Sequence, residues 1–355
     1  MDTLISHEAL RAYMERVFEK EGFGREDARV IADVLMQADL FGIESHGAQR
    51  MMYYHQNIAS GSVDTAAKIE TVRETPVSAL LDAHFAMGQL AGIRAMNMAI
   101  DKAKKTGVGM VCVRNSSHYG IAGYYPLMAA REGLCAFSMT NTGPIMVPTF
   151  GREMMLGTNP IAFCMPADPY PFWFDAATTV VTLGKVEVHA KREKAMPEGW
   201  TIDGEGEIST DAGKMNASIL SGGKGGILPL GGAGETNGGH KGYGLAIMVE
   251  ALTGVLAQGL VSPQMQGAHG DHTCHFFLAF DPAMFGDPDE IRAGMSRYLQ
   301  MLRESEKLPG CTRIYTPGEK AFEAQARRID EGIPVEEKTL MELRKIADAL
   351  GVEAI

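Results

Sequence analysis

Strand-like runs alternate with helical patterns through the middle of the sequence, and this alternation restricts the possible folds more than any other feature. Such alternation predicts an α/β fold built from layers of helices and strands. The helical patterns cover about 88–106, 119–132, 178–194 and 242–259, and the apolar strand-like runs lie at 77–82, 109–114, 134–139, 161–166, 172–175 and 275–280. A small hairpin is expected around Gly204.

The first sixty residues carry helical patterns instead. A first helix is predicted after Ser6, a candidate N-cap, because five apolar side chains recur at the spacing of one helix face: Leu10, Tyr13, Met14, Val17 and Phe18. A second helix is expected from Glu26 to Phe41. Ser45 is the candidate N-cap of a third helix that ends near Gly61.

The C-terminal part of the chain returns to helical patterns, at 287–307, 319–332 and 334–352. We expect the helices of the two ends to pack on each other. This gives a helical domain of residues 1–75 with 310–355, beside an α/β domain of residues 76–309.

Charge and hydropathy exclude several classes of protein. The formal net charge of -11 argues against a nucleic-acid surface, which needs a basic field. The most apolar stretch, 245–261, is interrupted by Glu250 and Gln258, so no membrane-spanning helix is expected. The N-terminus lacks the pattern of a signal peptide, which predicts a cytoplasmic location. The odd cysteine count and the absence of a CxxC pair favour reduced thiols.

A glycine-rich stretch at 221–244 holds eleven glycines in twenty-four residues and ends at His240-Lys241-Gly242, before a predicted helix. Glycines, a helix N-terminus and a lysine together favour binding of a phosphate. A flexible surface loop is the alternative reading. Neither a GxGxxG fingerprint nor a GxxxxGK[ST] loop occurs in the sequence, so a Rossmann or P-loop site is not predicted.

Two histidine motifs are candidates for acid/base chemistry. On a helix starting at Ser45, the side chains of His46, Arg50 and Tyr54 would share one face, with arginine suited to grip a carboxylate. His118 follows a predicted strand within the segment 115–120, and strand ends of α/β sheets are frequent ligand sites. The alternatives are an ordinary helix start for the first motif and a helix-capping serine beside a bystander histidine for the second.

The segment 269–275 reads HGDHTCH and could suggest a transition-metal site. We discount a metal because strand alternation would send His272 and His275 to opposite faces and no second ligand cluster accompanies them. No G-x-S-x-G elbow of a serine hydrolase is present either.

Taken together, these motifs resemble the malate/L-lactate dehydrogenase family of the non-Rossmann type, which includes malate, sulfolactate and ureidoglycolate dehydrogenases and 2,3-diketogulonate reductase. The matching segments follow the family's order from Ala38 to Lys320. They are residues 38–50, 113–125, 156–166, 174–179, 184–187, 228–246, 275–282 and 315–320.

The resemblance implies a family-specific NAD(P)-binding fold with a mixed sheet flanked by helices, and a homodimer. It implies NAD- or NADP-dependent interconversion of a small 2-hydroxy acid and its 2-oxo acid, of the malate, lactate or sulfolactate type. Reduction of a cyclic 2-imino acid or a diketo acid, and ureidoglycolate dehydrogenation, are the alternatives with the same cofactor. The expected partner is a small carboxylate, without nucleic acid, membrane or metal.

Family motifs also assign roles to individual residues. His118 and His46 are the acid/base candidates, with a slight preference for His118. Arg50 matches the arginine for the substrate carboxylate, and Ser45, Tyr54 and Asn159 are the other candidates at the substrate. The segments expected at the cofactor supply Thr142, Asp175, Ala176, Ala177, Thr178, His240, Lys241, Gly318 and Glu319.

Overall fold

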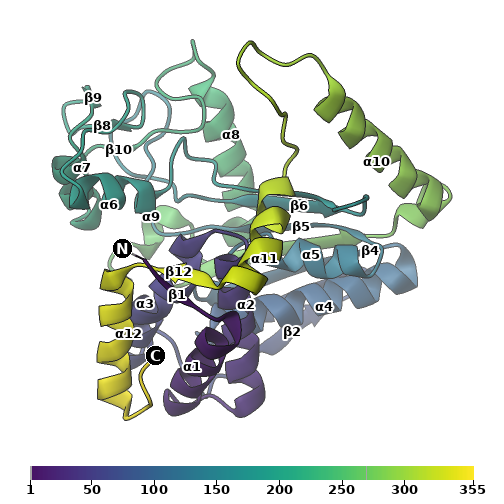
Figure 1. Cartoon of the computed structure of the whole chain (residues 1–355), viewed down its shortest axis with the longest axis horizontal. Coiled ribbons are helices and arrows are strands. Elements are labelled where there is room, and N and C mark those ends of the chain that lie inside the picture. Colours follow the sequence, from purple (N-terminus) through teal and green to yellow (C-terminus); the bar gives the residue numbers. More distant parts are fainter. Residues whose placement is uncertain (1, 269) are drawn as a thin grey trace.

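A seven-stranded mixed sheet forms the centre of the protein, in a computed structural model that describes residues 2–268 and 270–355 (Figure 1). The strand order is β2-β3-β4-β11-β5-β6-β7. Only β3 and β4 pair in parallel, and the other neighbours are antiparallel. The strands are β2 (Glu70–Glu74), β3 (Ser78–Asp82), β4 (Val108–Ser116), β5 (Cys135–Thr140), β6 (Ile161–Met165), β7 (Phe172–Ala176) and β11 (Thr273–Phe280).

The structure confirms all six predicted strand-like runs and adds the edge strand β2. The sequence of β2, ETVRE, is largely exposed and polar, so it carries no apolar alternation that would predict a strand. Its pairing with β3, which only the fold supplies, makes it a strand.

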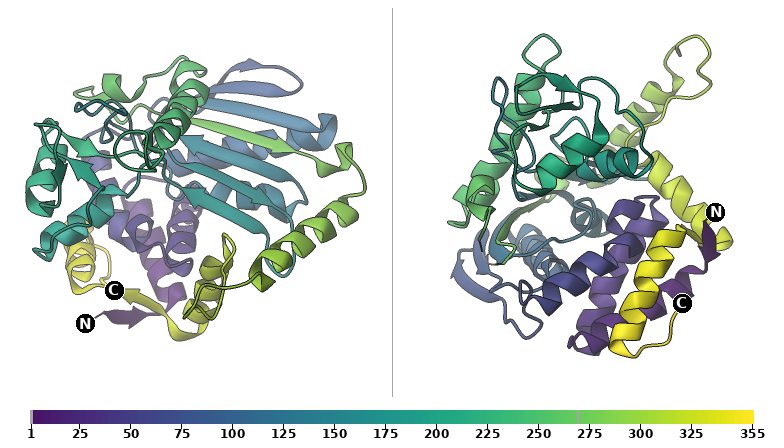
Figure 2. Two further views of the ribbon diagram at one scale, coloured as in Figure 1. Left: turned by 90° about the horizontal axis from the view of Figure 1, so that it is seen from above. Right: turned by 90° about the vertical axis from the view of Figure 1, so that its left-hand side faces the viewer.

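Helices cover both faces of this sheet (Figure 2). On one face α4 (Gly88–Thr106) and α5 (Tyr124–Arg131) enclose the largest apolar core, with Val111 and Phe277 of the sheet. On the other face, α8 (Gly239–Glu250) and the π-helical turn Ala251–Val255 pack on the sheet, where Val249 contacts the cluster of Cys112, Met139 and Phe276. The predicted helix at 242–259 is therefore divided by a change of helical type.

The two ends of the chain pack together. The helices α1 (His7–Lys20), α2 (Arg25–Leu40), α3 (Met51–Ala59) and α12 (Glu337–Leu350) share one apolar core. The hydroxyl of Tyr13 donates to the carbonyl of Leu343, and β1 (Thr3–Ile5) pairs with β12 (Ile333–Val335). Ser6 caps α1 as predicted, since its hydroxyl accepts from the N–H of Ala9. The exact domain boundaries stay a prediction.

A smaller unit lies beside the sheet and contains the predicted hairpin. Its core joins α6 (Leu183–Lys191) and α7 (Ala212–Leu220) with the strands β8 (Thr201–Ile202) and β10 (Gly226–Ile227). The strand β9 (Ile208–Ser209) pairs with β8. The remaining α-helices of the described residues are α9 (Ser262–Met265), α10 (Pro288–Glu304) and α11 (Glu319–Glu331). Within the described residues, no helix has the length and apolar character that crossing a membrane requires.

Candidate active site

A cavity of about 640 Å³ lies where the segment after α2 meets the loops of the sheet and the smaller unit. Its volume and its mixture of apolar and polar side chains are typical of a small-molecule or cofactor site. It collects side chains from both histidine motifs and from two of the segments expected at the cofactor. The predicted site residues that line it are Ser45, His46, Arg50, His118, Thr142, Asp175, Ala176 and Ala177.

The segment that carries His46 and Arg50 is not the start of a regular helix, so the prediction that Ser45 caps a helix was wrong. Two short 3-10 turns, η1 (Glu44–His46) and η2 (Ala48–Arg50), precede α3. Gly47 separates them, and a Cβ at this position would lie 1.9 Å from Oδ1 of the buried Asp39. The N–H of Ala48 donates to Oδ2 of Asp39 at 2.8 Å. Asp39 thus interrupts the helix and holds the chain between the two functional side chains.

Arg50 is held at one of its nitrogens. Its Nε–H donates to the carbonyl of Ser45 at 2.8 Å, and its guanidinium lies 5.8 Å from the centre of the Tyr53 ring. Its hydrogen bonds to the described residues use Nε alone, so the terminal NH₂ groups stay available for a ligand. A guanidinium whose two terminal NH₂ groups are available can bind a carboxylate in bidentate geometry.

His118 is oriented by three contacts in the loop after β4. The Tyr54 hydroxyl oxygen lies 2.6 Å from Nδ1, and the backbone nitrogen of Gly120 lies 3.4 Å from the same atom. The backbone N–H of His118 donates to Oδ2 of Asp271 at 3.0 Å. Since Nδ1 is occupied, Nε2 is the nitrogen left for a substrate. The His46 ring centre lies 5.5 Å from that of His118.

Burial and positive neighbours keep both histidines uncharged near neutral pH. Burial, followed by the charge of Arg50, lowers the pKa of His46 to about 4. Burial also holds the pKa of His118 well below its usual value, with His46, Arg50 and His275 adding to the effect. A neutral imidazole can accept a proton, so the pair is prepared to act as a base.

Asp271 and Tyr53 are parts of the site that the sequence analysis missed. Tyr53 lines the cavity, and its hydroxyl donates to the same Oδ2 of Asp271 that holds the backbone of His118. Burial raises the pKa of Asp271. Asp271 belongs to the HGDHTCH segment, so the only sequence signal was the cluster that we had weighed as a metal site.

His275 and His272 of the same segment do not line the cavity. His275 is buried, with Nδ1 2.8 Å from the Thr140 hydroxyl and Nε2 2.9 Å from the Ser116 hydroxyl. The His272 ring contacts Phe85 edge to face, and His269 lies outside the described residues. In the described part of the chain, no group of three His, Cys, Asp or Glu side chains is placed to hold a metal ion.

Among the residues predicted at the cofactor, Thr142 and the Asp175–Ala177 segment line the cavity. One oxygen of Asp175 accepts from the backbone N–H of Gly123 at 2.7 Å. Burial raises the pKa of Asp175 to about 6. Thr178 is buried behind this wall, and its hydroxyl contacts the carbonyls of Thr158 and Asn159.

Other predicted residues lie outside the cavity lining. Asn159 is fully buried, and its amide Nδ2 donates to Glu250 and to the carbonyl of Ala246. Tyr54 is buried behind His118. His240 and Lys241 are exposed in the first turn of α8.

The two C-terminal candidates for the cofactor also lie away from the lining. Gly318 packs against Trp173, close enough that a Cβ on the glycine would lie 2.9 Å from the Trp173 side chain. Glu319 forms ion pairs with Arg303 at 3.2 Å and Arg313 at 2.5 Å. Its carboxylate is therefore already paired within the chain.

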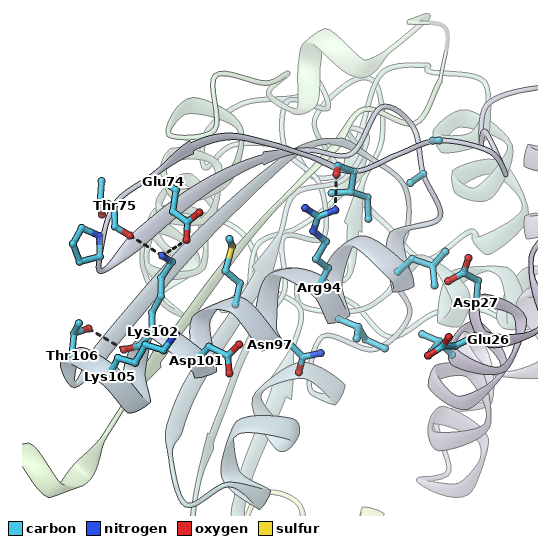
Figure 3. A pocket seen from close by; sticks show the side chains of 18 residues that line it. Glu26, Asp27, Glu74, Thr75, Arg94, Asn97, Asp101, Lys102, Lys105 and Thr106 are labelled. Carbon is cyan, nitrogen blue, oxygen red and sulfur yellow. Dashed lines mark hydrogen bonds and ion pairs between the residues drawn. The ribbon is translucent and has the colours of Figure 1, made fainter.

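A second, wider groove runs along the outer side of α4 but lacks comparable chemistry (Figure 3). Its buried Lys102 amine is bound by the Glu74 carboxylate and the Thr75 carbonyl, both at 2.7 Å. Arg94 donates to the carbonyl of Ile69 at 2.6 Å. Lys102 and Arg94 are thus already bound by oxygen atoms of the chain, and the residues that line this groove include no histidine.

Comparison with known proteins shows the family of this chain. The family model "Malate/L-lactate dehydrogenase" matches residues 5–344. The malate dehydrogenase of Pyrococcus horikoshii is 45% identical over 353 residues, 99% of this chain and 96% of its own length. The L-sulfolactate dehydrogenase of Methanocaldococcus jannaschii is 34% identical, over 95% of this chain and 94% of its own length. The crystal structure of malate dehydrogenase from Entamoeba histolytica has a TM-score of 0.96 at 35% identity, with 99% of each chain covered. This chain belongs to the malate/L-lactate dehydrogenase family.

Proposed function

We propose that the cavity binds NAD or NADP together with a small 2-hydroxy acid, and that the protein transfers hydride between them. One observation carries this proposal: Arg50 and His118 line the same cavity. The guanidinium of Arg50 has available NH₂ groups, and the imidazole of His118 is neutral and held in one orientation. Arg50 supplies the charge that holds a carboxylate, and His118 supplies a proton acceptor beside it.

The lining suits a dinucleotide cofactor. Ile121, Ala122 and Pro160 offer an apolar surface for a flat ring, while the hydroxyls of Thr142 and Thr158 offer polar contacts. Pro144 and Gly143 continue the wall beside them. When bound, the nicotinamide supplies or accepts the hydride.

The protein's own residues then manage the proton. For oxidation of the hydroxy acid, neutral His118 carries its proton on Nδ1, which donates to the Tyr54 oxygen. Nε2 then accepts the hydroxyl proton while Arg50 holds the carboxylate. For reduction of the oxo acid, His118 must carry a second proton, which burial and the neighbouring charges oppose. A bound carboxylate offsets the charge of Arg50 and so favours protonated His118. Substrate binding thereby prepares the acid that the reduction needs.

Malate and oxaloacetate are the proposed substrate pair, because the relative from Pyrococcus horikoshii is a malate dehydrogenase of almost the same length. Sulfolactate is the second substrate to test, because the relative from Methanocaldococcus jannaschii is an L-sulfolactate dehydrogenase. The test is a panel of oxaloacetate, pyruvate, sulfopyruvate and piperideine-2-carboxylate, each with NADH and with NADPH, followed by the loss of the reduced cofactor. No turnover with any 2-oxo acid would reject the proposal.

We also propose that the working form is a homodimer. Five large apolar side chains on α8 and just after it are exposed in the single chain: Leu245, Ile247, Met248, Val255 and Leu256. Such a stripe is unusual on a monomer surface. Light scattering after gel filtration should give twice the mass of the chain, and a monomer at micromolar concentration would contradict this.

A further inference from the structure

Glu250, the last residue of α8, is a buried carboxylate whose role the proposed chemistry does not explain. Its exposed fraction is 7%, although the sequence analysis noted it only as an interruption of an apolar stretch. Its hydrogen-bond partners among the described residues are amides and a hydroxyl rather than a cation. A buried carboxylate held in this way needs several donors, because each unsatisfied oxygen would cost free energy.

The carboxylate of Glu250 joins two loops through their asparagines. Nδ2 of Asn141 donates to Oε2 at 3.0 Å, and Nδ2 of Asn159 donates to Oε1 at 2.9 Å. Asn141 follows β5 directly, and Asn159 precedes β6. Both asparagines are fully buried. The two loops are thereby fixed relative to each other by one side chain.

Ser262 adds a third connection to the same carboxylate. Its backbone N–H donates to Oε2 of Glu250 at 3.3 Å, and its hydroxyl is in close hydrogen-bond contact with Oε1. The same hydroxyl lies 2.6 Å from the carbonyl of Thr142 and accepts from the N–H of Gly157 at 3.0 Å. Ser262 therefore bridges the same two loops a second time.

These loops are walls of the cavity. Thr142 follows Asn141 and Thr158 precedes Asn159, and both threonines line the cavity. The N–H of Thr158 donates to the Thr142 hydroxyl at 3.1 Å, so the two walls also touch. Gly157 has no room for a side chain, since a Cβ would lie 2.2 Å from the Thr142 hydroxyl. The spacing between the walls thus depends both on these direct contacts and on the contacts that converge on Glu250.

The backbone after Glu250 supports this arrangement. The helix changes to the π form at Ala251–Val255, and such turns are frequent at functional sites. Within it, Gly254 packs so closely that a Cβ would lie 2.7 Å from the Leu260 carbonyl and 3.0 Å from Nδ2 of Asn141. The turn therefore lets the chain return from α8 to Ser262 beside the carboxylate.

We propose that Glu250 is a positioning residue of the cofactor cavity, which sets the distance between the Thr142 and Thr158 walls through Asn141, Asn159 and Ser262. This inference rests on the proposed function in one respect, that NADH or NADPH is the ligand of the cavity. Glu250 itself does not line the cavity, so its effect on the ligand is indirect.

The test is Glu250→Gln in the full chain, with binding of NADH and NADPH measured by fluorescence titration. In either orientation of the glutamine amide, its NH₂ group faces the donor N–H of Asn141 or that of Asn159. One of these two hydrogen bonds is therefore lost, and the wall that it holds is no longer fixed. The Kd of the preferred cofactor should rise about tenfold, as expected for the loss of a charge-assisted contact. The kcat at saturating cofactor and the KM of the oxo acid should stay within about threefold, because Arg50 and His118 lie on other segments.

Glu21→Gln is the matched control. The Glu21 side chain is 6% exposed and contacts His55 at 2.5 Å, away from the cavity lining. It should lose thermal stability without a change in cofactor affinity. A native Kd in folded Glu250→Gln, or equal losses in all kinetic constants, would overturn the proposal.

Two further outcomes stay decisive. If Glu250→Gln does not fold, Ser262→Ala removes only the hydroxyl bridge and should still raise the cofactor Kd selectively, and an unchanged Kd there also overturns the proposal. If the native protein binds neither NADH nor NADPH, the proposed function fails first, and the role of Glu250 fails with it.

Discussion

At the scale of single residues, one side chain of the proposed site binds the substrate carboxylate and another transfers the proton. Arg50 binds no carboxylate of its own chain in the described residues and keeps its terminal NH₂ groups available. His118 is held from behind by Tyr54 and through its backbone by Asp271. Each group therefore has one orientation before a substrate arrives, which lowers the entropy lost on reaching the reactive geometry.

Replacing Arg50 should test the carboxylate contact. A charge-assisted bidentate pair implies that Arg50→Ala lowers kcat/KM for the oxo acid by about 10²–10⁴-fold. The Kd of NADH should change little. Arg50→Lys should retain only a small part of the native kcat/KM, because lysine lacks the planar, bidentate guanidinium group. Steady-state kinetics with both variants decide this, and near-native kcat/KM in Arg50→Ala would exclude the contact.

The two histidines can be distinguished by pH. Because burial lowers the pKa of His118, its neutral form already dominates near neutral pH. The kcat/KM for hydroxy-acid oxidation should therefore rise with pH through an acidic pKa and level off before neutrality. His118→Asn should lower this kcat/KM by about 10²–10⁴-fold and should remove the acidic limb of its pH profile. His46→Asn should mainly raise KM and keep the limb. Loss of the limb in the His46 variant alone would transfer the proton role to His46.

At the scale of elements, the decisive segment is the pair of 3-10 turns between α2 and α3. Asp39, at the end of α2, holds this segment through the N–H of Ala48, and Gly47 lies directly on its carboxylate. From the far end of the chain, Arg328 of α11 donates to the carbonyl of Asp39 at 2.5 Å and pairs with Glu44. A local interruption of a helix is thus maintained by contacts from two other helices.

Gly47→Ala should damage both stability and activity. Its Cβ would overlap the Asp39 carboxylate, and forced overpacking typically costs about 1–3 kcal/mol. Since His46 and Arg50 flank this residue, kcat/KM should fall as well. The control is Gly294→Ala in α10, where the Cβ would meet only the Arg297 side chain at 3.8 Å. That variant should gain about 0.5–1 kcal/mol in urea unfolding. Equal stability of both variants would contradict the steric argument.

Asp39 should also make the stability depend on pH. Burial, with the nearby charge of Glu44, raises the pKa of Asp39 to about 7. Between about pH 4 and this value the folded state keeps a proton that the unfolded chain has released. The contribution of this carboxyl to the free energy of unfolding is full below about pH 4 and is lost as the pH rises to about 7. Asp39→Asn should therefore flatten the pH dependence of the unfolding free energy in this window. An unchanged slope in urea titrations would show that another group titrates.

At the scale of the whole molecule, the cavity exists only because distant parts of the chain meet. The Ser45–Arg50 segment belongs to the end-to-end helical core, His118 and Thr142 follow sheet strands, and Gly184 and Ser221 come from the smaller unit. A dinucleotide is a long ligand, so we expect its phosphate end to extend beyond this cavity towards the first turn of α8.

Lys241 tests that extension. It is exposed at the N-terminus of α8, a position that favours anions. Lys241→Ala should weaken NADH binding, with a milder effect on kcat at saturating cofactor. The loss should shrink as salt concentration rises, because the attraction is partly screened. Calorimetry at low and high salt measures this, and an unchanged Kd would place the phosphates elsewhere.

The sequence by itself predicted most of the elements and the candidate reacting groups. Periodicity predicted α4 at its observed bounds and the central strands, because local patterns report which side chains face the core. His46, Arg50 and His118 were proposed because each lies in a short motif of chemically distinctive residues. Thr142 and the segment from Asp175 were proposed from the resemblance to the family. The prediction that Ser45 caps a helix was wrong, because the backbone N–H of Ala48 donates to the Asp39 carboxylate instead of joining a regular helix. No local sequence pattern reveals this contact.

Only the tertiary structure decided how these groups are held. Asp271 reaches the backbone of His118 from 153 positions away, and Glu250 reaches Asn141 from 109 and Asn159 from 91. Buried polar groups must be paired, but which partner each finds depends on how distant segments are placed against one another. That placement results from the packing of the whole core, so the supporting side chains could not be predicted from the order of residues alone.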